Sequence, residues 1–138
     1  MNLTTIVVSA ILSLSPNLGE NRAREVAVPI AAVAPTTEDA LLLVVTAFRE
    51  SSFRKEVETC EVRGDAGLAH TLFQLHVRNL WPHGPEVACS RPVVAAGLAL
   101  RTLGRGTVEE RVSRFMGRKP TNREVQWRVA MTRALEAL

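Results

Sequence analysis

The longest apolar stretch of the chain covers residues 40–48, where Thr46 is the only polar position. A helix that is hydrophobic on all sides belongs in the interior of a domain. Thr36 and Asp39 precede the stretch in the spacing of a capping box, in which a hydroxyl and a carboxylate accept the first free N–H groups of a helix. We therefore expect a buried central helix that starts after Thr36 and ends near Glu50.

Helical spacing of apolar residues and capping patterns predict further helices around this one. They cover residues 3–14, 20–34, 92–103, 108–116 and 122–137. Pro29 is expected to bend or split the second of these helices. Gly97 should let the third approach the central helix closely. Thr107 and Thr121 stand in capping-box spacing and should start the last two.

Residues 55–69 lack helical periodicity and contain Gly64 and Gly67, which is typical of a hairpin or an irregular loop. With 138 residues, 46% of them hydrophobic, the chain has enough apolar material for one core. The expected fold is a single, mainly α domain over residues 1–138, of the α+β kind. A buried central helix would be its core, and a small hairpin or irregular loop would form one wall.

Glu50 occupies the last turn of the expected central helix. The negative pole of the helix dipole and partial burial both disfavour a charged carboxylate there, and they favour the protonated form that a general acid needs. The alternative is a surface Glu50 that pairs with Arg54, because Glu and Arg four residues apart attract each other if the helix continues. The spacing alone leaves both open.

Two motifs give the chain a resemblance to a known family. Residues 49–53 read RESSF and resemble the E-S-x-F signature of lysozyme-like soluble lytic transglycosylases and goose-type lysozymes, in which the Glu closes a buried helix. Residues 64–75 read GDAGLAHTLFQL and resemble the family's second signature, G-D-x-G-x-A-x-G-L-x-Q-I/L. The resemblance implies a lysozyme-like fold and cleavage of the β-1,4 link between N-acetylmuramic acid and N-acetylglucosamine in peptidoglycan.

The resemblance also implies roles for individual residues. Glu50 would act alone as catalytic acid and base, without a cofactor. Ser51 and Gln74 match motif positions, and the Gln74 amide would meet a sugar N-acetyl group or Glu50. Phe73 and His76 would line the sugar groove, although Phe73 fits the core as well. The product would be the 1,6-anhydro sugar of a lytic transglycosylase or the reducing end of a muramidase, and the resemblance favours the former.

The chain departs from the family pattern in three places. Thr71 replaces a Gly, residues 93–100 keep the third signature without its Asn and Tyr, and the chain contains no Tyr at all. These departures support an alternative on the same fold, a glycan-binding or structural module without catalysis.

Two further residues are candidates for contact with a sugar. Asp65 would hold a water or orient a sugar, but Gly-Asp-x-Gly is also ordinary turn chemistry. Trp81 lies in the loop Trp-Pro-His-Gly-Pro, where it would stack on a sugar face or cap the core.

Cys60 and Cys89 flank the expected hairpin region. If they pair, they close a loop of about 30 residues and indicate an oxidising compartment. The alternative is two buried thiols. His70, His76 and His83 show none of the spacings typical of zinc sites, so no metal is expected.

The net charge of +3 and an isoelectric point of ≈ 9.5 suit an anionic polymer as partner. Basic residues gather in the C-terminal third, where two short helices raise the alternative of a helix-turn-helix DNA-binding protein. The expected helices lack the short turn of that motif. Peptidoglycan strands are therefore the expected partner, and no nucleic acid is expected.

The expected first helix, residues 3–14, is not typical of a signal peptide, because no Lys or Arg precedes it and no small-x-small cleavage site follows. It is also too short to span a bilayer. Since peptidoglycan lies outside the cytoplasmic membrane, we expect the protein to act in the periplasm or cell wall. It would reach that place by secretion or as a bacteriophage lysis (endolysin) or virion enzyme, and we expect a monomer.

Overall fold

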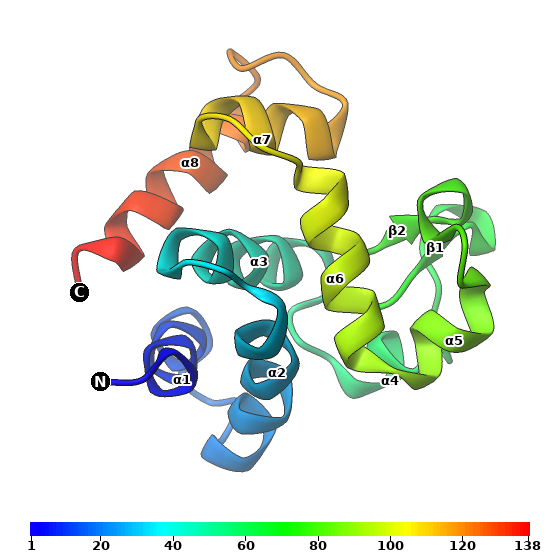
Figure 1. The fold of residues 1–138 in the computed structure, drawn as a ribbon, viewed down its shortest axis with the longest axis horizontal. Coiled ribbons are helices and arrows are strands. Elements are labelled where there is room, and N and C mark those ends of the chain that lie inside the picture. Colours follow the sequence, from blue (N-terminus) through cyan, green and yellow to red (C-terminus); the bar gives the residue numbers. More distant parts are fainter.

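The computed structural model describes residues 1–138 and shows a mainly α fold with one small β-hairpin, as expected (Figure 1). Its helices and strands follow in the order α1 (Leu3–Leu14), α2 (Glu20–Val33), α3 (Thr37–Ser51), α4 (Lys55–Glu58), β1 (Ala69–His70), β2 (Leu75–His76), α5 (Gly84–Ser90), α6 (Pro92–Leu103), α7 (Val108–Met116) and α8 (Arg123–Glu136). Two 3₁₀ turns, Asp65–Gly67 and Val77–Leu80, flank the hairpin. None of the helices has the length and apolar character needed to cross a bilayer.

Helix α3 forms the centre of the molecule, as its apolar run predicts. Every residue from Ala40 to Ala47 is buried, and α1, α2, α6 and α8 all contact the helix (Figure 1). The capping box at its start is present: the hydroxyl of Thr36 accepts from the N–H of Asp39 at 3.1 Å, and the Asp39 carboxylate accepts from the N–H of Thr36 at 3.1 Å. The cap fixes where α3 begins, and the buried run fixes how the helix lies in the core. The position of Glu50 in the last turn follows from both.

Helix α2 runs without a break through Pro29, so the expected split of this helix is wrong. Proline removes one intrahelical hydrogen bond, but α2 packs along α1 on one side and α6 on another, and this packing maintains the helix. Helix α6 contacts α2 more extensively than α3, contrary to the expectation for Gly97. A Cβ added at Gly97 would lie 3.9 Å from Val33, an ordinary contact, so no close approach requires the glycine.

Helix α8 begins one residue later than its sequence pattern indicates. Its cap is Asn122, whose side-chain oxygen accepts from the N–H groups of Glu124 at 2.9 Å and Val125 at 3.3 Å. The capping box predicted from Thr121 is therefore wrong, because the Glu124 carboxylate binds two arginines and does not reach back to the backbone. Helix α5 was not predicted, since its Gly and Pro favoured a loop.

The hairpin wall is short and irregular. Strands β1 and β2 pair antiparallel with Ala69 opposite His76 and His70 opposite Leu75. An isolated bridge joins Gly64 to Ala69 and extends the wall by one step. The ladder is short, and besides a few turn hydrogen bonds such as that from the N–H of Val77 to the carbonyl of Leu68, the wall depends on side-chain bonds and on a covalent link.

That link is the disulfide between Cys60 and Cys89, with the two Cα atoms 5.6 Å apart and a sequence separation of 29. It joins the segment after α4 to α5 and so closes the hairpin region at its base. The pairing predicted from the sequence is confirmed, and the alternative of two free thiols is wrong.

Removal of the disulfide by Cys60→Ala and Cys89→Ala together should lower the free energy of unfolding by about 3–4 kcal/mol, because the unfolded chain regains the entropy of an open loop. Urea unfolding of the two proteins measures the difference. A change below about 1 kcal/mol would contradict a stabilising role for this bridge.

Candidate active site

Glu50 lies in the last turn of α3, which ends abruptly behind it. Ser52 and Phe53 both adopt left-handed backbone angles, with φ of 52° and 61°. The hydroxyl of Ser51 donates to the carbonyl of Ala47 at 2.7 Å and accepts from the N–H of Phe53 at 3.3 Å. Ser51 is therefore buried and occupied by the backbone, where it shapes the helix end that presents Glu50.

The Glu50 carboxylate forms an ion pair with Arg128 of α8. Its Oε2 accepts a hydrogen bond from Nη2 of Arg128 at 2.7 Å, while Oε1 makes no hydrogen bond within the protein. The Arg128 side chain is only 6% exposed and the Glu50 side chain is 26% exposed. One oxygen of Glu50 is thus anchored by a buried cation, and the other is free to exchange a proton with a ligand.

Arg128 belongs to a chain of alternating charges that connects α3 with α8. Its Nε donates to Glu124 at 3.0 Å, and the Glu124 carboxylate accepts two bonds from Arg49, at 2.7 and 2.6 Å. The guanidinium of Arg49 in turn lies 4.4 Å from the ring centre of Trp127. The hydrogen bond from Arg49 is the largest of the effects that lower the pKa of Glu124, which therefore stays ionised and keeps Arg128 in place.

The pair of Glu50 with Arg54, which was the alternative interpretation, does not form, but Glu50 does pair with another arginine, Arg128. Helix α3 ends at Ser51, so Arg54 leaves the helical face and approaches Glu56 instead, at 3.6 Å. Arg128 was missed because it lies 78 residues further along the chain, where no local spacing connects it with Glu50. The structure thus gives Glu50 a buried cationic partner that the sequence analysis did not anticipate.

The guanidinium of Arg128 retains unused capacity for hydrogen bonding. Its Nη1 is buried and has no partner, whereas Nε and Nη2 are both bonded. Buried donors without a partner are uncommon, because each loses its hydrogen bonds to water. Nη1 is therefore the one buried polar atom of this pair that has no partner.

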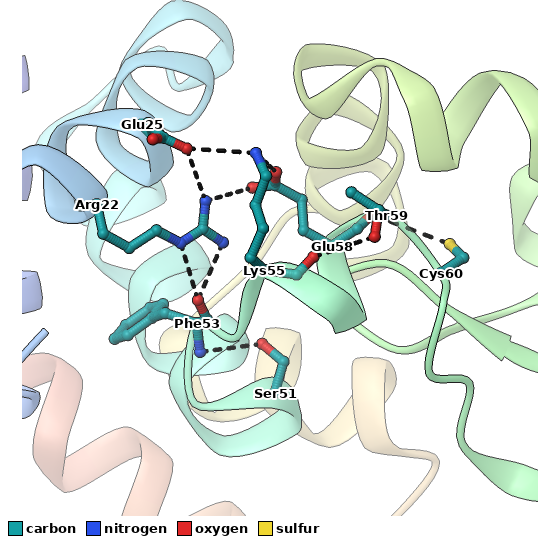
Figure 2. Close-up of polar contacts among 8 residues, drawn as sticks. All are labelled: Arg22, Glu25, Ser51, Phe53, Lys55, Glu58, Thr59 and Cys60. Carbon is teal, nitrogen blue, oxygen red and sulfur yellow. Dashed lines mark hydrogen bonds and ion pairs between the residues drawn. The ribbon is translucent and has the colours of Figure 1, made fainter.

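Arg22 of α2 bonds to the turn that follows α3, at the carbonyl of Phe53, as Figure 2 shows. Arg22 donates from Nε and Nη2 to the carbonyl of Phe53 at 3.1 and 3.0 Å, and from Nη1 to Glu58 at 3.1 Å. Lys55 also binds Glu58, at 2.9 Å. This network was not predicted, because Arg22 lies 31 positions from Phe53 and no local spacing connects the two.

Gln74 closes the loop of the hairpin with its side-chain amide. Its Oε1 accepts from the N–H of Gly64 at 3.0 Å, and its Nε2 donates to the carbonyl of Thr71 at 2.9 Å. A Cβ at Gly64 would collide with Oε1 of Gln74, so a larger residue here would displace the Gln74 amide from its bond to the Gly64 N–H. The two ends of the second motif are therefore one structural unit, and contact between Gln74 and a sugar stays a prediction.

The other candidate residues differ in their access to a ligand. Phe73 is only 3% exposed and belongs to the core cluster, which was its alternative interpretation. His76 is half-buried, and its Nδ1 accepts a long bond of 3.5 Å from the N–H of Arg78. Asp65 is exposed in a turn with φ of 50°. Trp81 is 75% exposed, so its ring is free to stack on a sugar.

His70 on β1 is buried, and burial is the largest of the effects that lower the pKa of its imidazole, followed by the charge of Arg63. Its Nδ1 has no hydrogen-bond partner. The chain contains no group of three His, Cys, Asp or Glu residues arranged to hold a metal ion.

Comparison of the chain with protein-family models, with curated proteins and with solved structures found no match in any of the three. The function is therefore argued from the geometry described above together with the two sequence motifs.

Replacement of Glu124 by Gln should destabilise the protein by about 1–2 kcal/mol at pH 7, because it removes charge-assisted bonds to two arginines in a half-buried place. The folded state lowers the pKa of Glu124 below 4.5, so its contribution is complete above that pH and disappears as the pH falls through the lowered value. Urea unfolding at pH 7 and pH 3 should show a difference from wild type that shrinks in acid.

A suitable control is Glu136→Gln, at the exposed end of the same helix and without an ion pair or hydrogen bond. It should change the free energy of unfolding little at either pH. A loss for Glu124→Gln that is equally large at pH 3 would contradict the assigned role of its charge.

Proposed function

We propose that this protein is a peptidoglycan-cleaving glycosidase of the lytic transglycosylase or muramidase type, with Glu50 as its single general acid and base. The observation that supports this most is the carboxylate of Glu50 at the end of a buried helix, with Oε1 free of hydrogen bonds within the protein. The two motifs shared with lysozyme-like enzymes support the choice of substrate, the link between N-acetylmuramic acid and N-acetylglucosamine.

A one-carboxylate mechanism agrees with the surroundings of the other acids. Glu124 is bound by Arg49 and Arg128, and Glu58 is buried between Arg22 and Lys55. A nucleophilic carboxylate must be free to approach the sugar ring. Neither of these residues has that freedom.

In the proposed reaction, Oε1 of Glu50 donates its proton to the glycosidic oxygen as the bond to the muramic acid breaks. The guanidinium of Arg128 stabilises the resulting carboxylate, and the same ion pair opposes the protonated form with which the reaction begins. In the second step Glu50 takes a proton from the 6-hydroxyl of the same muramic acid, which forms the 1,6-anhydro sugar, or from a water molecule, which forms a reducing end. The sequence motifs favour the anhydro product.

The disulfide supports a place of action outside the reducing cytosol, because such bonds persist in oxidising compartments. We therefore propose that the protein acts in the periplasm or the cell wall, as a secreted enzyme or as a bacteriophage lysis or virion enzyme. The net charge of +3 suits the anionic envelope of a bacterium.

The second candidate is a glycan-binding or structural module without catalysis. The amide of Gln74 is bonded within its own loop, Phe73 is buried, and the chain has no Tyr near Glu50. Exposed Trp81 would serve such a module equally well. Cleavage of peptidoglycan separates the two candidates directly.

A helix-turn-helix function receives less support. Six residues, 117–122, separate α7 from α8, and several arginines of these helices bind carboxylates of the protein itself. Arg111 binds Asp39 at 2.6 Å, and Arg133 binds Glu109 at 2.6 Å. These pairs leave few charges of the two helices for a phosphate backbone.

Digestion of purified peptidoglycan tests the proposed function. The intact protein should release soluble anhydro-muropeptides, and Glu50→Gln should be slower by about 10²–10⁴-fold because it cannot transfer the proton. Mass spectrometry of the fragments identifies the product. Glu86→Gln, an exposed change in α5 without a bonded partner, is the control and should remain active.

Reducing ends in place of anhydro sugars would assign the chain as a muramidase. Binding of peptidoglycan without any fragments between pH 4 and 8 would reject the enzyme and favour the glycan-binding module. Equal activity of Glu50→Gln and wild type would show that Glu50 is not the acid.

Arg128 should act as a positioning residue for Glu50. Arg128→Gln should lower kcat about tenfold or more with little change in KM, since it affects the reacting carboxylate rather than substrate binding. Arg128→Lys should recover part of kcat, because one ammonium retains the charge but not the fork that holds Glu50 and Glu124 together. Thermal unfolding of each variant confirms that it is folded at the assay temperature.

Arg133→Gln provides the matched control, because Arg133 lies on the same helix as Arg128 and its ion pair with Glu109 of α7 is exposed. It should leave kcat unchanged. A folded Arg128→Gln variant with normal kcat would contradict the positioning role.

A further inference from the structure

A hollow of ≈ 410 Å³ lies between the segment after the hairpin, the end of α6 and the end of α7. Arg78, Arg101 and Arg114 line it from these three segments, together with the polar side chains of Asn79 and Thr102. No Asp or Glu contributes to its lining. The hollow therefore brings together three positive charges without a negative one.

These arginines differ from the more buried arginines of the protein. Arg22, Arg111 and Arg128 each form an ion pair with at least one carboxylate. The three arginines of the hollow form no ion pair within 4.0 Å, and Arg78 makes no side-chain hydrogen bond. The lowered pKa of nearby Glu110, which lies outside the lining, is due first to its hydrogen bond with the backbone of Thr107, and the charge of Arg114 contributes to it.

Backbone carbonyls orient two of the three guanidinium groups. Arg101 donates from Nη2 to the carbonyl of Asn79 at 2.9 Å, which links α6 to the segment after the hairpin. Arg114 donates from Nη1 to the carbonyl of Leu103, at the end of α6, at 2.5 Å and to that of Arg105 at 2.9 Å. A neutral carbonyl positions a guanidinium without cancelling its charge, and the remaining N–H groups stay available for a ligand.

We propose that this hollow binds an oxyanion carried by a cell-wall polymer, and that the oxyanion is a carboxylate of the peptide stems of peptidoglycan. Guanidinium groups pair with carboxylate and phosphate oxygens through two parallel hydrogen bonds, so both anions share the required chemistry. The choice of the peptide stem rests on the proposed function, in which the same substrate reaches Glu50.

The size and the remaining lining agree with a peptide. The volume falls within the range of roughly 300–1,000 Å³ that is usual for small-ligand sites. Phe115 and Met116 add apolar surface beside the charges, which suits the methyl and methylene groups of stem residues. Helix α7, which carries Arg114, packs against α8, which carries Arg128. The helix that lines the hollow therefore packs against the helix whose Arg128 binds Glu50.

The test measures binding of the full chain carrying Glu50→Gln, which should not cleave, to insoluble peptidoglycan freed of phosphate polymers. Chemical amidation of the carboxyl groups should weaken binding about tenfold. Adding Arg78→Gln and Arg101→Gln should weaken binding to the untreated polymer by a similar factor and remove the response to amidation. The double change to Lys should retain part of the affinity. Arg114 stays unchanged, because it also bonds the end of α6.

The matched control replaces Arg91 and Arg123 by Gln. Both arginines are exposed, form no ion pair and lie outside the hollow, so the control removes the same amount of charge. An equal loss in this control would overturn the proposal in favour of general charge attraction. The absence of any response to amidation would overturn it as well. In a separate arm, binding only to walls that keep their phosphate polymers would overturn the carboxylate and assign the phosphate as the oxyanion. Equal or tighter binding of double-stranded DNA, lost with Arg78 and Arg101, would overturn it in favour of nucleic acid.

The outcomes for the hollow and for the cleavage are separable. A wild-type protein that binds as described but releases no fragments would refute the proposed cleavage and retain the hollow. A protein that cleaves peptidoglycan but shows no difference among the binding arms would refute the hollow alone.

Discussion

Arg128 connects the candidate site with the packing of the helices. A guanidinium that is almost completely buried needs carboxylates around it, because an uncompensated charge in the interior costs several kcal/mol. Glu124 from its own helix and Glu50 from α3 meet this need. The docking of α8 on α3 and the orientation of the Glu50 carboxylate therefore depend on the same side chain. A change that loosens one is expected to disturb the other.

The turn that follows Glu50 illustrates a second constraint. Ser52 and Phe53 both have positive φ, a region that side chains rarely adopt and that costs of the order of 1–3 kcal/mol per residue. The turn is held in this shape by Ser51 from inside the helix and by Arg22 from α2. The abrupt end leaves Glu50 in the last turn of α3, facing α8 rather than a continuing helix. The strained turn ends α3 directly after Glu50 and so determines where its carboxylate lies.

The parts of this arrangement that depend on local chemistry were predictable from the sequence. The apolar run and the capping box at Thr36 identify α3, and the position of Glu50 in its last turn follows from them. The disulfide was also foreseen, although with an open alternative. The mainly α fold class follows from the helical spacing of apolar residues. The hairpin follows from the one glycine-rich segment that interrupts this spacing.

The partners of the site residues depend on contacts between distant segments, which periodicity does not reveal. Arg128 reaches Glu50 across 78 positions and Arg22 reaches Phe53 across 31. Gln74 has a clear motif position, yet only the fold shows that its amide is bonded to Gly64 and Thr71. The cap of α8 differs from its pattern for the same reason, since Glu124 binds arginines of two helices.

The most direct test of the central claim is a crystal structure of the Glu50→Gln protein with a bound peptidoglycan tetrasaccharide. The account predicts a glycosidic oxygen about 2.6–3.2 Å from the side chain of residue 50, on the side not held by Arg128. A tetrasaccharide bound elsewhere, with residue 50 remote from every glycosidic oxygen, would contradict the assignment of this carboxylate as the catalytic acid.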